Sequence, residues 1–202
     1  ISYELTDEDK QRKKAIIAGY AAKRERGEVV NDEDMYRDLA MVNKLSPSKL
    51  PLFRQFVAKK PEILERCLIF VETKDYGTAV QNILIDFCPI YHTYYGEDDA
   101  ANLARFASGE LNCLITCKKI SEGIDIKTVK NIILFSSDRS KLVTTQRIGR
   151  SLRVDPNDPG KRANVIDFIC RSADSENAEE LTADEERMRW LEQLSHTRRD
   201  NT

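Results

Sequence analysis

The distribution of apolar residues along the chain changes near Arg66. The part before it is polar, with apolar residues at helical spacing, which predicts a run of helices. We expect the first helix to begin at a capping box around Thr6 and to end before Gly27. A second helix is expected over 34–45 and a third from about residue 46, so the first part of the chain is predicted to be helical.

After Arg66, short apolar runs alternate with helical patterns. These runs are apolar on both faces, which is typical of parallel strands that helices cover on both sides. The fold class predicted is therefore α/β, with strands at 67–72, 89–94, 112–116, 131–135 and 164–168. Helical patterns lie around 79–87, 103–106 and 148–152. A capping box at Thr182 predicts a last helix, with Met188, Leu191 and Leu194 on its packed face.

Composition excludes several classes of protein. The 202 residues are 41% hydrophobic and 33% charged, which suits a folded domain rather than a disordered chain. No apolar run reaches the roughly 18 residues of a membrane span. The net charge of −2 excludes a polycation, so any nucleic-acid site must be a local patch. The sequence opens on Ile1 without a leader pattern, and we expect a fragment of a longer protein.

The five cysteines have no metal-binding spacing. Cys113 and Cys117 alternate with Ile115 along one face of an apolar run, as buried residues of a strand do. His92 and His196 lie far apart in the sequence. We therefore expect buried, reduced thiols, no metal site and a cytoplasmic protein.

Two segments stand out as candidate chemistry. In open α/β sheets, ligands bind beyond the carboxyl ends of the strands, and the segment 120–126 directly follows a predicted strand. In it, Gly123 permits a tight loop and Asp125 can accept hydrogen bonds from a ribose hydroxyl or orient an arginine. An ordinary turn with a capping aspartate is the alternative.

The second segment, 146–153, lies on a predicted helix. On a helical wheel Gln146, Arg150 and Arg153 fall within roughly 60° of one another. Two guanidinium groups on one rigid face suit a phosphate, because each can bind two oxygens at once. The alternative is a solvated basic face.

These pieces, in this order, resemble the second, C-terminal RecA-like domain of superfamily 2 helicases and translocases of the DEAD/DEAH-box type. Residues 68–73 resemble motif IV, 114–126 resemble motif V, and 146–153 match the QxxGRxxR pattern of motif VI. The resemblance spans about 48–170 and implies a RecA-like sheet. The segments 3–8 and 120–135 resemble DNA-repair and restriction-type members, which favours double-stranded DNA over RNA as the substrate.

The resemblance also implies roles for individual residues. Arg150 and Arg153 would contact the γ-phosphate of ATP as arginine fingers, and Gln146 would lie near that phosphate or the attacking water. Asp125 would reach the ribose or brace Arg150, in a loop shaped by Gly123. ATP and Mg²⁺ would be held mainly by an N-terminal RecA-like domain of the same full-length chain.

Contacts to a nucleic-acid backbone are implied at Thr73, Gly96, Thr116 and Lys118. The spacing from Thr116 to Gly123 is one residue longer than the common motif V pattern. Cys117 therefore takes the place of the phosphate-contacting threonine, and either Thr116 replaces it through a loop shift or that contact is lost. Solvated loop residues are the alternative for these positions.

The predicted organisation is a helical extension over 1–47, a RecA-like domain over 48–173 and a C-terminal helix over 174–202. No GxxxxGK[ST] phosphate loop occurs in the sequence. We therefore expect half of an ATPase, inactive alone and active with its N-terminal partner domain and nucleic acid. A non-catalytic RecA-like scaffold is the main alternative, and a small-molecule phosphotransferase on a doubly wound sheet is a weaker one.

Overall fold

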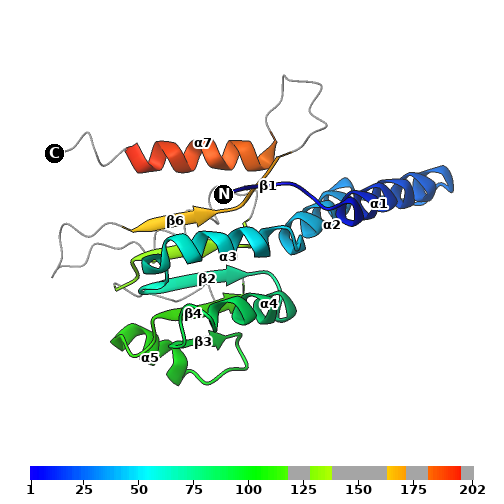
Figure 1. The fold of residues 1–202 in the computed structure, drawn as a ribbon. Helices are drawn as coiled ribbons and strands as arrows, with labels where there is room; N and C mark the ends of the chain where they lie inside the picture. The colour runs from blue at the N-terminus through cyan, green and yellow to red at the C-terminus, as the bar shows by residue number, and fades with distance from the viewer. Residues whose placement is uncertain (118–127, 138–162, 172–181, 197–202) are drawn as a thin grey trace.

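A five-stranded parallel sheet forms the centre of the molecule (Figure 1). The computed structural model describes residues 1–117, 128–137, 163–171 and 182–196. The strand order is β3-β4-β2-β5-β6, and every neighbouring pair is parallel. The strands are β2 (Cys67–Val71), β3 (Tyr91–Tyr94), β4 (Cys113–Cys117), β5 (Asn131–Leu134) and β6 (Asn164–Asp167). The α/β class and all five predicted strands are confirmed, with ends within two residues of those expected.

Helices cover both faces of this sheet (Figure 1). The described helices are α1 (Asp7–Glu25), α2 (Asp32–Leu45), α3 (Lys49–Lys59), the 3-10 helix η1 (Pro61–Leu64), α4 (Lys74–Leu84), α5 (Ala101–Ser108) and α7 (Ala183–His196). Of these, α3, α4, α5 and α7 pack on the sheet. The predicted capping boxes are present: Thr6 caps α1 together with Asp9, and Thr182 accepts from the backbone of Glu185 and donates to its carboxylate. The helix expected around 148–152 lies outside the described residues.

The alternation of side chains along the strands divides the core into two layers. On one face, Ile69, Ile115 and Ile133 pack with α3 and α4. On the other, Leu68 and Leu114 pack with α5 and α7. Both layers are buried because the central strands β2, β4 and β5 are apolar at successive positions.

The structure adds a pair of strands that the sequence pattern did not predict. Strand β1 (Ser2–Tyr3) pairs in parallel with β7 (Ile169–Cys170), which follows β6 after one residue. The backbone nitrogen of Ile1 donates to the Asp167 carbonyl over 2.8 Å. The first residues of the chain therefore lie beside the carboxyl end of β6, and α1 begins there.

The packed face of α7 differs from the prediction. Met188 and Leu194 are 38% and 45% exposed, whereas Arg187 and Trp190 are buried. Leu191 packs against the core as expected. Apolar spacing misplaced this face because the helix turns an arginine inward to reach a buried carboxylate. The five cysteines are free, as predicted, with Cys117 half-buried and the other four buried.

Candidate functional site at the carboxyl edge of the sheet

Three predicted nucleic-acid residues lie at the carboxyl ends of adjacent strands. Thr73 follows β2 and caps α4 by accepting from the Tyr76 amide over 3.2 Å. Gly96 follows β3 with a positive φ of 81° and is exposed. An ion pair of 2.5 Å between Lys74 Nζ and Glu97 Oε2 joins the two loops. Thr73 and Gly96 therefore belong to one local surface, which carries the Thr73 hydroxyl and the paired Lys74 ammonium.

Thr116, the third of these residues, is fully buried. Its hydroxyl donates to the Tyr94 carbonyl over 2.9 Å, across the β3–β4 pair. In this arrangement the hydroxyl is used in a hydrogen bond within the sheet. A contact between Thr116 and a bound strand would require the loop shift considered from the motif V spacing.

At the carboxyl ends of β2 and β5, the edge of the sheet carries charged side chains. Lys44 of α2 pairs with Glu72 over 3.2 Å, and Ser136 donates to the same carboxylate. Lys49 of α3 is only 2% exposed and donates to the Phe135 carbonyl over 2.8 Å. Burial lowers the pKa of Lys49 to about 7. These contacts fix the backbone at the end of β5, immediately before residues 138–162.

The end of β6 carries a buried ion pair. Asp167 accepts from Arg187 Nε over 2.6 Å, and both side chains are about 5% exposed. Ser137 donates to the same aspartate over 2.7 Å, so α7, β6 and the end of β5 are tied together. Sequence reasoning missed Asp167 and Arg187. The one available signal was a carboxylate within an otherwise apolar strand, 20 residues before an arginine on an amphipathic helix.

The remaining predicted site residues lie outside the described residues. They are Gln146, Arg150 and Arg153, expected to be catalytic; Gly123 and Asp125, expected to bind the nucleotide; and Lys118, expected to contact nucleic acid. Their roles stay predictions. The described part fixes only the strand ends from which their segments start: β4 ends at Cys117, and Ser137 follows β5.

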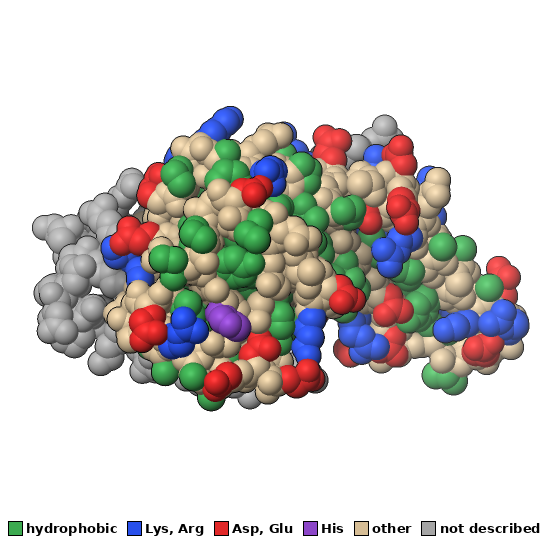
Figure 2. Space-filling view, turned by 60° about the horizontal axis from the view of Figure 1, so that its bottom comes forward, with side chains coloured by type: hydrophobic (Ala, Val, Ile, Leu, Met, Phe, Trp, Pro, Cys, Tyr) green, Lys and Arg blue, Asp and Glu red, His purple; other side chains and the backbone are tan. Residues whose placement is uncertain are grey.

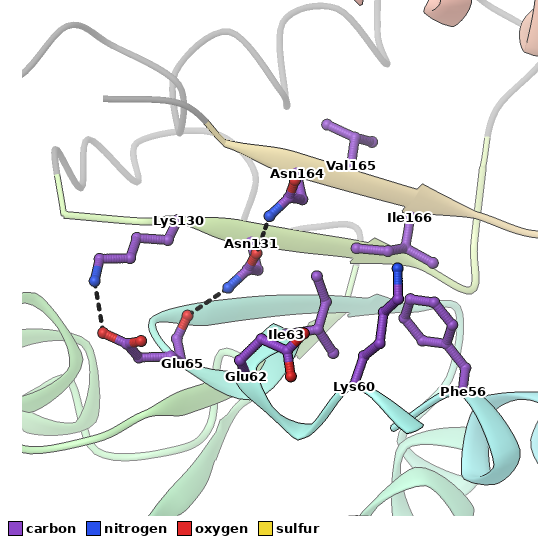
Figure 3. A pocket seen from close by; sticks show the side chains of 10 residues that line it. All are labelled: Phe56, Lys60, Glu62, Ile63, Glu65, Lys130, Asn131, Asn164, Val165 and Ile166. Carbon is purple, nitrogen blue, oxygen red and sulfur yellow. Dashed lines mark hydrogen bonds and ion pairs between the residues drawn. The ribbon is translucent and has the colours of Figure 1, made fainter. Parts of the chain in front are cut away.

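A hollow lies at the opposite, amino edge of the sheet (Figure 3). It measures about 530 Å³ and has an apolar side formed by Phe56, Ile63 and Ile166. Asn164 donates to Asn131 over 2.8 Å along its polar side. No predicted site residue lines it, and strand-end chemistry of the kind expected in an α/β fold belongs to the other edge.

The described residues contain no cluster of His, Cys, Asp and Glu able to hold a metal ion. None of the helices within these ranges combines the length and apolar character needed to cross a bilayer.

Comparison with known proteins relates the chain to helicases. A family model described as "Helicase conserved C-terminal domain" matches residues 48–155, more than half of the chain. The fold is similar to the C-terminal part of the Fun30 ATPase domain, with 14% identity over 89% of this chain and 60% of that one and a TM-score of 0.50. No curated protein matches the chain.

Two further solved structures are similar to it. The helicase domain of Pyrococcus furiosus Hef matches at 16% identity, over 92% of this chain and 37% of that one, with a TM-score of 0.48. S. cerevisiae Dbp5 bound to RNA and ADP BeF3 matches at 20% identity, over 62% and 33%, with a TM-score of 0.49. The chain thus spans about a third of the length of these two proteins.

Proposed function

Because the chain belongs to the family of helicase conserved C-terminal domains, the C-terminal RecA-like domains of superfamily 2 helicases, we propose that it is one of two motor lobes of an ATP-dependent translocase on double-stranded DNA. The family match includes the QxxGRxxR segment, and this is the observation that carries the proposal. Support also comes from the parallel sheet, since the segments expected to carry the site all follow its strands.

The residues present suit ATP by their chemistry. Arg150 and Arg153 stay charged and can each bind two phosphate oxygens, so they would hold the γ-phosphate and stabilise the negative charge that develops in hydrolysis. Gln146 would position the phosphate or a water. Asp125, beside Gly123, would bind the ribose or orient Arg150. The phosphate loop and Mg²⁺ ligands would come from an N-terminal RecA-like lobe.

The nucleic-acid surface is proposed at the loops joined by the Lys74–Glu97 pair. Thr73 and Gly96, with Lys118, would contact backbone phosphates, which positions a strand without reading its sequence. Closing and opening of the two lobes with the nucleotide cycle would move the strand. The free cysteines support a reducing compartment, the cytoplasm.

One observation favours the non-catalytic alternative. The hydroxyl of Thr116, which would replace the motif V threonine, is buried and donates within the sheet. A scaffold that keeps the fold but does not contact a nucleic-acid strand would tolerate a buried Thr116 hydroxyl. Nucleic-acid-stimulated ATPase activity in the protein that carries both lobes separates the two functions, because only a motor would show it.

Arg150→Ala in the two-lobed protein tests the motor. Loss of an arginine finger lowers hydrolysis by about 10³–10⁵-fold, so turnover should fall to background while ATP binding largely survives. Arg54→Ala, at an exposed arginine of α3 (52% exposed), is the control and should leave turnover unchanged. Normal turnover in Arg150→Ala would remove the finger assignment. Stimulation by duplex DNA, measured beside single-stranded RNA, tests the substrate, and a preference for RNA would overturn the DNA assignment.

A further inference from the structure

Helices α1 and α2 form an arm that extends past the carboxyl ends of the strands (Figure 1). The two helices are held together by a hydrogen bond from Tyr20 to Asp38, 2.8 Å long, and an ion pair between Arg24 and Asp32. At the base, the buried Asp9 accepts from Ser46 Oγ over 2.7 Å. The arm is therefore attached through hydrogen bonds, at the sheet edge that carries the candidate site.

The charge of the arm is uneven. Between Lys10 and Arg24 the sequence has six cationic and no acidic side chains, although the whole chain carries −2. All of these cations except the half-buried Lys13 are exposed. Figure 2 shows Lys and Arg side chains standing out from the arm, at the right of the molecule, beside acidic ones. The stretch from Lys10 to Arg24 is thus locally basic, within a helix whose ends carry Asp7, Glu8, Asp9 and Glu25.

Only part of this charge is neutralised within the described residues. Arg24 pairs with Asp32, and Lys10 lies 3.7 Å from Asp7. Lys23 lies over the Tyr20 ring at 4.9 Å, which leaves its charge in place. Arg12 and Lys14 make no ion pair in the part of the chain that the structure describes, and both are exposed.

The geometry of α1 arranges these cations in two rows. Lys10 and Lys14 are one turn apart, and Arg12 and Lys23 lie three turns apart on roughly the opposite side of the helix. The surface between the rows carries small residues such as Ala15 and Ala18, both exposed. The helix is about 28 Å long at 1.5 Å per residue. A nucleic-acid backbone presents regularly spaced negative charges over such a length.

We propose that the exposed cations of α1, namely Lys10, Arg12, Lys14 and Lys23, bind the phosphate backbone of the nucleic acid on which the motor acts. This inference rests on the proposed function and adds a second contact surface to the Thr73 and Gly96 loops. Both surfaces lie at the carboxyl edge, so one duplex could contact them together. That shared edge favours nucleic acid over an acidic protein as the occupant.

Salt-dependent binding tests the proposal. In the protein that carries this chain, Arg12, Lys14 and Lys23 are replaced by Gln, a change that keeps helix propensity nearly constant. Binding of a fluorescent random-sequence DNA duplex, and of one of its single strands, is measured from low to moderate salt. The control replaces Lys59, Lys60 and Lys130 by Gln. It removes the same charge from the amino edge, and circular dichroism verifies both folds.

The α1 variant is expected to bind duplex DNA about tenfold or more weakly at ~0.1 M salt, with the slope of log K against log salt reduced by about 3. The control should keep the slope of the unsubstituted protein. An unchanged slope in the α1 variant would overturn the proposed role of the α1 cations while leaving the proposed motor function intact. The same result is expected if α1 binds an acidic protein instead. If the unsubstituted protein binds neither duplex nor single strand, the proposed function itself fails.

Discussion

Gly77, inside helix α4, makes room for the ring of Tyr95. A Cβ at position 77 would lie 1.9 Å from Tyr95 Oη and 2.9 Å from Cζ. Glycine inside a helix ordinarily costs about 0.5–1 kcal/mol relative to alanine. Here the close approach reverses that preference, because a methyl group would push Tyr95 out of place and move the adjacent Gly96.

We expect Gly77→Ala to lower the free energy of unfolding by about 1–3 kcal/mol, the usual cost of overpacking. Gly19→Ala is the matched control, since no atom lies within 4 Å of a Cβ there. In the middle of α1 it should raise stability by about 0.5–1 kcal/mol. Urea unfolding measures both values. Equal gains in the two variants would mean that Tyr95 does not require the glycine.

The lowered pKa of the buried Lys49 predicts that the stability of the protein depends on pH. Desolvation lowers its pKa from 10.5 to about 7, against opposing effects of Asp167 and Asp184, while Arg187 lowers it further. Since the folded pKa lies below the unfolded one, the unfolded chain holds an extra proton between these values. The contribution of Lys49 to the free energy of unfolding therefore rises with pH from about 7 upward.

Lys49→Met removes this dependence. From pH 7 to pH 9, the unsubstituted protein should gain about 2 kcal/mol of unfolding free energy relative to the variant. This follows from roughly 1.4 kcal/mol per pKa unit. Urea unfolding at several pH values gives this difference, with Lys59→Met as the control for losing a lysine from α3. A difference that stays constant with pH would refute the assignment.

At the scale of elements, α7 is held by charge as well as by Trp190. Arg187 pairs with Asp167 at 2.6 Å and with Asp184 at 3.0 Å, and its side chain is 5% exposed. Its Nη2 also donates to the Phe168 carbonyl. The helix thus covers one face of the sheet while its arginine reaches the ends of β6 and, through Ser137, β5.

Arg187→Met should cost about 3–5 kcal/mol, because it leaves Asp167 buried without a counterion. The double variant with Asp167→Leu should cost less than the sum of the two single changes, since an apolar pair needs no counterion. Arg54→Met, which breaks the exposed pair with Asp86, should cost no more than about 1 kcal/mol. Strictly additive losses would show that the pair does not couple.

At the scale of the whole molecule, the sheet was predictable because its central strands β2, β4 and β5 are mostly apolar, continuous runs. The α1 cap and the last capping box were predictable because both are local sequence signals. Strands β1 and β7 were not predictable, since a strand of two residues is too short to show an alternation of apolar and polar positions. Lys49, Asp167 and Arg187 were missed because their partners are distant in sequence and charged residues are ordinarily exposed.

The candidate site was predictable to a different extent. The placement of Thr73 and Gly96 at the carboxyl ends of β2 and β3, the two neighbours of β4, follows from the parallel topology. The burial of Thr116 does not, because it depends on a hydrogen bond to β3. Long-range electrostatic contacts thus account for most of what the sequence pattern left out.

The pairing of β1 with β7 has a consequence for synthesis on the ribosome. Ser2 and Tyr3 are made well over a hundred residues before their partners Ile169 and Cys170. At about 5–20 residues per second, strand β1 therefore waits on the order of ten seconds for its pairing partner during synthesis. Closure of this seam should therefore be a late event of biogenesis, and a nascent chain stalled before residue 169 would expose the Tyr3 side chain to chaperones.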